Sequence, residues 1–235
     1  MTIQFRVTAL LVGLLVYLAK PCIASELAAP GGVAVVESSP IKNDNSKGTK
    51  MSSIFTFIGG SKGQWSVKKI TGVKGQPIAE VSALRIVESD VREKNSEEKW
   101  LFKGFTSNTR YATSDEVASL KKLQPEIGRK EATCAAMILV KKSDSWWQLA
   151  QDQRRKIFEE QSHHNSIGMD YLPAVARRLH HSRDLGEEFD FITWFEFAPS
   201  DIPKFDELVD RLRASEEWTY VEREVDVRLE QGQEE

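Results

Sequence analysis

The sequence has few cysteines and histidines, the residues that build disulfides and many metal sites, and it has no excess of basic residues. Its 235 residues include two cysteines and four histidines, and acidic residues outnumber basic ones, which gives a net charge of −3. Nucleic-acid binding needs a basic face, so this charge balance gives no support to a nucleic-acid partner. The cysteines and histidines also lack the spacing of a zinc site.

Long apolar segments are scarce as well. One apolar run, residues 7–19, follows Arg6 and is shorter than the roughly 20 residues that a membrane span needs. Small residues before Ser25 then offer a cleavage position, so residues 1–25 are predicted to be a secretory signal peptide. An uncleaved anchor is the alternative. We expect a periplasmic protein that has no stable membrane association after cleavage.

The next segment, residues 26–50, is rich in Gly, Pro, Ser, Asn and Lys and predicts a flexible linker. Met51 follows it and is an alternative start site, and a chain that began there would be cytoplasmic. Signal cleavage would remove Cys22 and leave Cys134 alone, which excludes an internal disulfide. Because Cys134 stands in an apolar segment, it is predicted to be a buried, inert thiol.

Apolar periodicity and turn residues predict a mixed α and β chain from residue 51 onward. The expected strands cover residues 54–58, 64–70, 80–87, 99–111, 132–140 and 189–197, with one more near the C-terminus. The expected helices cover residues 114–123, 145–181 and a segment after Ser200. Gly168 and Pro173 are expected to break the long helical stretch.

Alternation within the last strands predicts which side chains share a face. One face of residues 189–197 would carry Phe189, Phe191, Phe195 and Phe197. The last strand would point Val225, Val227 and Leu229 inward and Asp226, Arg228 and Glu230 outward. Helices that cross one face of antiparallel sheets predict an α+β fold. The pattern favours two ferredoxin-like subdomains, residues 51–130 and 131–230, followed by a tail, residues 231–235.

Tryptophan and histidine concentrate in the second half of the chain. Four of the six tryptophans and all four histidines lie after residue 145. Taken singly, each is more often structural than functional. On one unbroken helix His164 and Arg177 would be about 20 Å apart. A break near Gly168 or Pro173 would instead let two helical segments bring an imidazole and a guanidinium to opposite faces of a flat ligand, which suits a haem with an anionic ligand.

Several motifs occur together and in order, and the order is informative. They are Lys142-x-x-x-Trp146-Trp147, Ser162-His163-His164, Leu172-Pro-Ala-x-Ala-Arg177, Phe189-Asp-Phe-x-Thr-Trp194-Phe195-Glu196 and Glu216-Glu217-Trp218. This arrangement resembles the chlorite dismutase family, most of all its short, dimeric branch, over about residues 51–229. The resemblance implies a dimeric ferredoxin-like homodimer with one haem b per subunit in the C-terminal subdomain, and an enzyme that converts chlorite to chloride and dioxygen.

The resemblance also assigns residues to the iron. His164 would be the iron ligand, and His163 would face away. Glu217 would accept a hydrogen bond from the other ring nitrogen of His164, which makes the imidazole more electron-donating.

Further residues would surround the substrate and the haem edge. By the same resemblance, Arg177 would attract chlorite and hold the leaving hypochlorite, and Gln124 would orient Arg177. Near the haem edge and propionates the family pattern places Lys142, Trp146, Trp147 and Tyr111. Trp194 and Trp218 are expected to be packing residues.

Three alternatives stay open. A coproheme decarboxylase of the same fold family usually carries a glutamine in place of the distal arginine, so Arg177 argues against it. A peroxidase-like or haem-binding stress protein would share the site but not the substrate. A dimeric ferredoxin-like scaffold without haem is the non-enzymatic alternative.

Overall fold

The computed structural model describes residues 53–106 and 111–232, so the predicted signal peptide and linker lie outside the described residues. The strands are β1 Ile54–Gly60, β2 Trp65–Lys74, β3 Ala83–Val87, β4 Glu98–Phe105, β5 Cys134–Lys142, β6 Ala176–His181, β7 Phe191–Phe197 and β8 Val221–Gln231. The α-helices are α1 Ser114–Leu123, α2 Asp144–Gln148, α3 Gln151–Arg155, α4 His164–Asp170 and α5 Ile202–Arg213. A π-helix, Lys156–Gln161, continues α3, and short 3₁₀ turns include Glu216–Tyr220 before β8.

The strands join into one closed antiparallel barrel in the order β1-β3-β2-β8-β5-β7-β6-β4. Strands β1 to β4 form one adjacent run and β5 to β8 form another. The two runs meet along a long β2–β8 ladder and at a single β4–β6 pair, Phe105 with His181. The predicted α+β class with antiparallel strands is confirmed, but the two runs form one barrel instead of two separate sheets.

Strand β5 is buried on both faces, which explains why its sequence is an unbroken apolar run. Ala135, Met137 and Leu139 point into the barrel, where they join the core around Phe57 and Trp194. The alternating residues Ala136, Ile138 and Val140 face a second core, which the helices cover. A strand that is buried on both faces needs apolar residues at every position.

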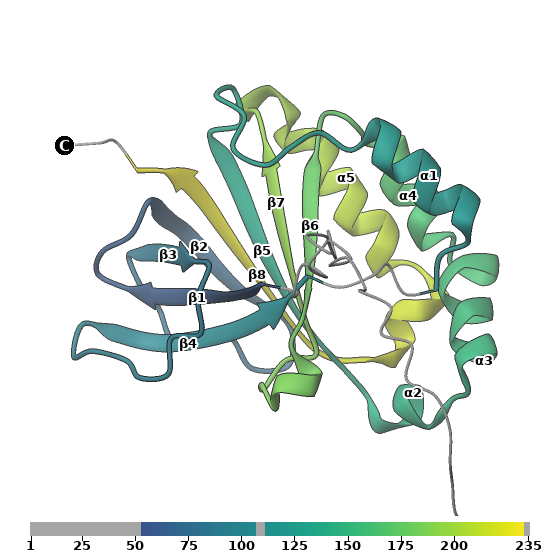
Figure 1. Ribbon diagram of the computed structural model, residues 1–235, viewed down its shortest axis with the longest axis horizontal. Coiled ribbons are helices and arrows are strands. Elements are labelled where there is room, and N and C mark those ends of the chain that lie inside the picture. The colour runs from purple at the N-terminus through teal and green to yellow at the C-terminus, as the bar shows by residue number, and fades with distance from the viewer. Residues whose placement is uncertain (1–52, 107–110, 233–235) are drawn as a thin grey trace, which may run out of the picture. The chain divides into compact units, whose positions relative to one another are not determined.

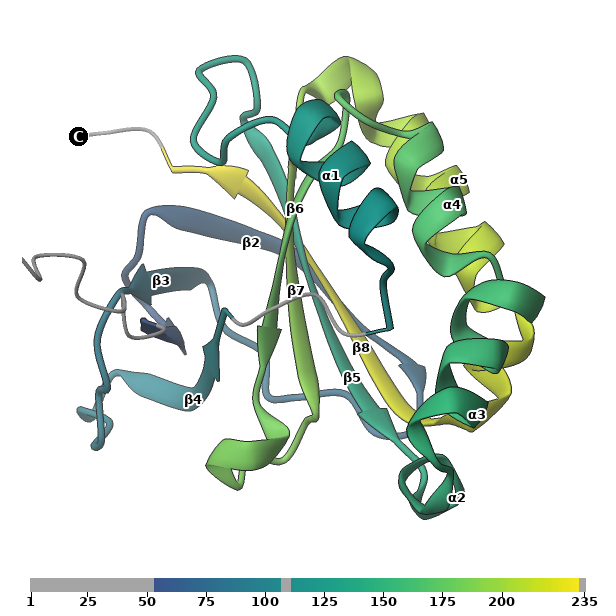
Figure 2. The same cartoon turned by 45° about the vertical axis from the view of Figure 1, so that its right-hand side comes forward.

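The helices lie on the outer face of strands β5 to β8 (Figure 1). The view in Figure 2 agrees: α1, α3, α4 and α5 form one layer beside β5, β6 and β7. Helix α5 belongs to this layer because Phe205, Leu208, Val209 and Leu212 make a buried stripe at helical spacing. No helix interrupts the strands of the first half within residues 53–106.

One secondary-structure prediction is wrong: residues 176–181 form strand β6, not the end of a helix. Helix α4 ends at Asp170, and Pro173 lacks the backbone N–H that a continuing helix requires. The backbone of residues 176–181 then pairs with β7 along its length. Burial along β6 does not alternate, since Ala176, His180 and His181 are all buried. The sequence therefore carries no period-2 pattern for this strand.

One face assignment is also wrong. Phe189 lies before β7 and packs edge-on against Phe102 in the barrel core, away from Phe195 and Phe197. Asp226 lies on the outer face of the barrel as predicted, opposite Ile138, but it is buried there. It accepts hydrogen bonds from the guanidinium groups of Arg213 and Arg228, which replace the water that the carboxylate loses. Cys134, in contrast, is buried as predicted, and burial raises the pKa of its thiol.

No helix in the described part of the chain is long and apolar enough to cross a membrane.

His180 is a titratable side chain in an apolar part of the barrel core. His180 is 2% exposed and packs edge-on against Phe55 and Phe57. Burial lowers the pKa of His180 to about 4, although its Nδ1 hydrogen bond to the Ile192 carbonyl acts the other way. At pH 7 His180 is therefore neutral.

The lowered pKa of His180 predicts a loss of stability in acid. In the unfolded chain a histidine titrates near pH 6.5, so as the pH falls from about 6.5 to 4 the unfolded state takes up the proton first. The free energy of unfolding should drop by about 3 kcal/mol over this window because of His180 alone. We expect His180→Phe to flatten the pH dependence of urea unfolding, whereas the exposed control His163→Gln should leave it unchanged. Equal slopes in all three proteins would contradict this role.

Candidate active site

A cavity of about 330 Å³ lies between the outer face of the barrel and the helical layer. Its volume falls within the roughly 300–1,000 Å³ range of small-molecule and cofactor sites. Strands β5, β6 and β7 supply one wall, with Ile138, Thr193 and Phe195 among its residues, and α4 and α5 supply the other. Seven of the eight predicted site residues line this cavity, namely Tyr111, Gln124, Lys142, Trp146, His164, Arg177 and Glu217.

Three of these residues form a charged chain at one end of the cavity. His164 Nδ1 lies 2.6 Å from Glu217 Oε2, and Lys142 Nζ lies 2.7 Å from Glu217 Oε1. Glu217 is 3% exposed and Lys142 is 4% exposed, so the pair is shielded from water. His164, at the start of α4, is less covered and borders the cavity.

The two neighbours of Glu217 keep its carboxyl group ionised. Burial alone would raise the pKa of the Glu217 carboxyl, but the positive charges of His164 and Lys142 outweigh burial and hold the pKa at about 2. Glu217 is thus a carboxylate at pH 7. Because Nδ1 of His164 donates to that carboxylate, Nε2 is the ring nitrogen left to bond a metal ion.

Two contacts that the sequence did not predict support this pair: one holds the His164 ring and the other holds Glu217. Phe158 stacks on the His164 ring, with the centroids 4.3 Å apart. The Ser162 hydroxyl accepts a hydrogen bond from the backbone N–H of Glu217. Phe158 belongs to the π-helix, where the residue spacing departs from 3.6, so an amphipathic pattern could not identify it. His163 has a positive φ, is exposed and does not line the cavity.

Arg177 enters the cavity from strand β6, which belongs to the wall that faces α4. Its guanidinium packs on the backbone of Gly168 in α4, where a Cβ would come within 1.7 Å of Nη1. Removal from water lowers the pKa of Arg177 to about 10, and the nearby Glu159 charge partly offsets this. Arg177 therefore stays positively charged at pH 7.

Gln124 contacts the main chain of Arg177 instead of its guanidinium. Its Nε2 donates a hydrogen bond of 2.5 Å to the Arg177 carbonyl oxygen. Gln124 is the C-terminal cap of α1, so this bond fastens α1 to the start of β6. The glutamine thus positions the strand that carries the arginine.

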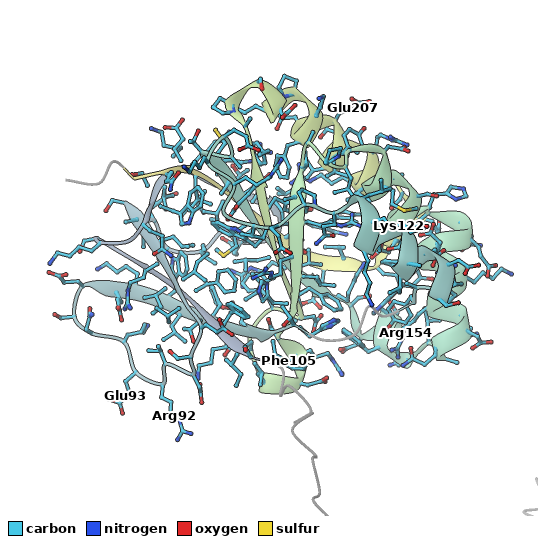
Figure 3. The ribbon with its side chains drawn as sticks, turned by 45° about the horizontal axis from the view of Figure 1, so that its top comes forward. Arg92, Glu93, Phe105, Lys122, Arg154 and Glu207 are labelled. Carbon is cyan, nitrogen blue, oxygen red and sulfur yellow. The ribbon has the colours of Figure 1, made fainter. Side chains whose placement is uncertain are left out.

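Aromatic and basic residues close another side of the cavity. The Trp146 ring is buried, lies edge-on to Tyr111 and is 4.7 Å from Lys142 Nζ. Arg154 links two of these residues, because it donates hydrogen bonds to the Tyr111 hydroxyl and to the Trp146 carbonyl. Figure 3 shows Arg154 on the helix-bearing side of the molecule, far from Arg92 and Glu93 on the barrel loop.

Trp147 is the predicted site residue that does not line the cavity. It stacks on the back of Phe191 and donates from Nε1 to Asp190. The Arg183 guanidinium covers its ring at 4.1 Å. Trp147 therefore supports the strand wall from behind.

The other two tryptophans of the second half, Trp194 and Trp218, differ from each other. Trp194 packs in the barrel against Phe57 and Trp65, as expected for a packing residue. Trp218 borders the cavity, and its Nε1 donates to the buried carboxylate of Glu224. Trp218 was predicted only to pack, and Glu224 was not predicted at all. Trp218 lies in the turn before β8 and Glu224 lies within β8, where the residue pattern is typical of ordinary strand alternation.

Two hydrogen-bond donors in the cavity wall lack a protein acceptor. Trp146 Nε1 and Asn165 Nδ2 are buried and have no hydrogen-bond partner among the described residues. Unpaired buried donors are costly, so such groups usually serve a ligand or bound water. Within residues 53–106 and 111–232 there is no cluster of three or more His, Cys, Asp or Glu side chains that could hold a free metal ion.

Fold and site together define an α+β barrel protein with a cofactor-sized cavity, in which a carboxylate-backed imidazole and a guanidinium come from facing walls. The chlorite dismutase family model matches residues 79–230, which is more than half of the chain. The chain belongs to the chlorite dismutase family.

Similar proteins support this assignment. The structure of dimeric chlorite dismutases from Nitrobacter winogradskyi is 46% identical, with a TM-score of 0.70, over 76% of this chain and 99% of that one. Chlorite dismutase from Candidatus Nitrospira defluvii in complex with imidazole shares the fold, at 18% identity and a TM-score of 0.56, over 77% of this chain and 92% of that one. The chlorite dismutase of Ideonella dechloratans is 34% identical over 113 residues, which is 45% of this chain and 36% of that protein.

The contact between Gly168 and Arg177 predicts that one substitution will move the Arg177 guanidinium without lowering the stability of the protein. Gly168→Ala should keep or raise the free energy of unfolding, by up to about 1 kcal/mol, because alanine favours a helix interior. The new methyl group should nevertheless push the Arg177 guanidinium off α4. A crystal structure and a thermal melt of the variant test this, with the exposed Ser166→Ala as control. An unmoved guanidinium would contradict the prediction.

Proposed function

We propose that this protein is a haem b enzyme that converts chlorite to chloride and dioxygen. The observation that carries the proposal is the buried chain from Lys142 through Glu217 to His164, which faces Arg177 across one cavity. Such a chain leaves one imidazole nitrogen that could hold a haem iron, and the guanidinium would supply a fixed positive charge for an anionic substrate. Membership of the family supports the same reaction.

The cavity residues fit a haem. Its walls combine apolar side chains, such as Ile138 and Phe195, with few polar groups, as a flat macrocycle requires. Trp146 Nε1 and Asn165 Nδ2 are unpaired donors, and haem carries two carboxylates that could accept from such groups. In this proposal His164 holds the iron, and Trp146 and Tyr111 lie along the haem edge. Lys142, which was expected at the haem edge, instead pairs with Glu217 behind His164.

Each residue of the chain contributes a physical task to the reaction. When bound, haem supplies the redox chemistry that breaks chlorine–oxygen bonds and forms the oxygen–oxygen bond. Glu217 keeps the His164 Nδ1 proton hydrogen-bonded and so makes the imidazole a stronger electron donor. Arg177 attracts the chlorite anion and retains anionic hypochlorite, because its charge persists at pH 7. Gln124 fixes the start of the strand from which Arg177 projects.

The proposed roles predict different failures for two variants. His164→Ala should lose the Soret absorption of haem-reconstituted protein, whereas the exposed neighbour control His163→Ala should keep it. Arg177→Ala should keep haem but release oxygen from chlorite at least about tenfold more slowly, and it should bleach after fewer turnovers. An oxygen electrode and absorption spectra measure both effects. Unchanged turnover and lifetime in Arg177→Ala would remove this residue from the mechanism.

Coproheme decarboxylation is the alternative activity on the same fold. Arg177 occupies the position where decarboxylases usually carry a glutamine, and Gln124 here binds main chain on β6. The positive charge of Arg177 favours the binding of a small anion such as chlorite, and so favours chlorite conversion over coproheme decarboxylation. Mass spectrometry of coproheme after peroxide addition separates the two activities.

Assembly and architecture follow the family as proposals. The Nitrobacter winogradskyi relative is described as dimeric, which supports a homodimer here. The strands neighbour one another in the order β4-β1-β3-β2 in the first run and in the equivalent order β8-β5-β7-β6 in the second. In the second run helices follow β5 and β7, its first and third strands. This order supports two ferredoxin-like subdomains, with the haem in the second.

A secreted, periplasmic location stays a prediction from residues 1–25. If the signal peptide is cleaved after Ala24 or Ser25, N-terminal sequencing should show that the mature protein begins at Ser25 or Glu26. The measurement would be made on protein expressed from the full reading frame. A mature chain that begins at Met51 would contradict export and indicate a cytoplasmic enzyme.

A further inference from the structure

Glu159 is a buried carboxylate beside the site that none of the roles above uses. It belongs to the π-helix Lys156–Gln161 and is 8% exposed. Its Oε2 accepts a hydrogen bond of 2.6 Å from the backbone N–H of Asn165, and its Oε1 accepts one of 3.2 Å from that of Ser166. These two N–H groups belong to the first turn of α4, directly after His164.

Helix α4 has no other side-chain cap. The residue at its N-cap position, His163, has a φ of 53° and makes no side-chain capping bond. The first amides of a helix are unpaired unless a side chain or water accepts from them, and a carboxylate there also interacts favourably with the helix dipole. Glu159, in the preceding π-helix, therefore caps α4 in place of the residue at the N-cap position.

The π-helix is what brings Glu159 to this position. Its wider turn places two consecutive residues beside His164. Phe158 stacks on the His164 ring, and Glu159 accepts hydrogen bonds from the amides that follow His164. Single π-turns occur frequently at functional sites. The ring and the backbone of the same histidine are thus held by neighbouring residues.

The helix whose first turn Glu159 caps also supports Arg177. The Arg177 guanidinium rests on the backbone of Gly168, one turn after His164 in the same helix.

We propose that Glu159 is a positioning residue that holds the first turn of α4, and with it His164, by capping the Asn165 and Ser166 amides. This inference rests on the proposed function, in which His164 binds haem iron. Glu159 would contact neither haem nor the anion, and it acts through His164.

The test compares haem-reconstituted wild type with Glu159→Gln, which keeps the size and one oxygen acceptor but removes the charge. Glu160→Gln is the matched control, because Glu160 is the adjacent, exposed carboxylate of the same π-helix. Three quantities are measured: hydrogen exchange of the Asn165 and Ser166 amides, the iron–imidazole vibration by resonance Raman, and the rate of haem transfer to apomyoglobin.

In Glu159→Gln we expect faster exchange of both amides, a shifted iron–imidazole band, and haem loss about 10-fold to 100-fold faster than in wild type, as is typical when a supporting residue of a metal ligand is removed. Glu160→Gln should match wild type in all three. If Glu159→Gln also matches wild type, the inference is overturned while the haem assignment stands. If wild type itself shows no iron–imidazole band, the haem assignment fails and this inference fails with it.

Discussion

The site depends on a single carboxylate that is kept charged in the protein interior. Glu217 is almost completely buried, and an isolated carboxylate there would be neutral or would destabilise the fold. Lys142 and His164 each bind one of its oxygens, so the charge is paired on both sides. Removing one member of such a group leaves an uncompensated buried charge, which costs about 3–5 kcal/mol. The three residues are therefore constrained together, and the orientation of the His164 ring follows from that constraint.

The fold brings these residues together from distant parts of the chain. Lys142 ends β5, His164 begins α4, and Glu217 lies in the 3₁₀ turn before β8. The pairing of β5 with β8 aligns Lys142 with Val221, close to that turn. Strand β6 then carries Arg177 into the cavity from the opposite wall. The long β2–β8 ladder closes the barrel behind them, so that the wall formed by β5 to β7 has a rigid, apolar core on its other side.

Local signals predicted some elements closely. Helix α1 covers residues 114–123 as predicted, because Thr113 and Glu116 form a capping box that defines where the helix begins. Strand β5 was recognisable from its apolar run. Strand β6 was not, because the cavity, the barrel core and the β4 contact impose burial that does not alternate along it. Arg177 was therefore predicted in the cavity but on the wrong type of element.

The residues that support the site were the hardest to predict. Phe158 and Glu159 reach His164 only because of a π-turn, and Gly168 matters only because a guanidinium rests on it. Asn165 and Trp146 stand out by unpaired donors, a property that exists only in three dimensions. The predicted residues with family motifs came together, except Trp147, which packs behind Phe191.

The central claim is that His164 is the residue that bonds the iron. His181 on β6 also borders the cavity, so the claim distinguishes between two imidazoles on facing walls. A crystal structure of the haem-loaded protein tests it most directly. The account predicts iron bonded to Nε2 of His164, with Nδ1 still hydrogen-bonded to Glu217. Iron bonded to His181, or to no histidine, would contradict it.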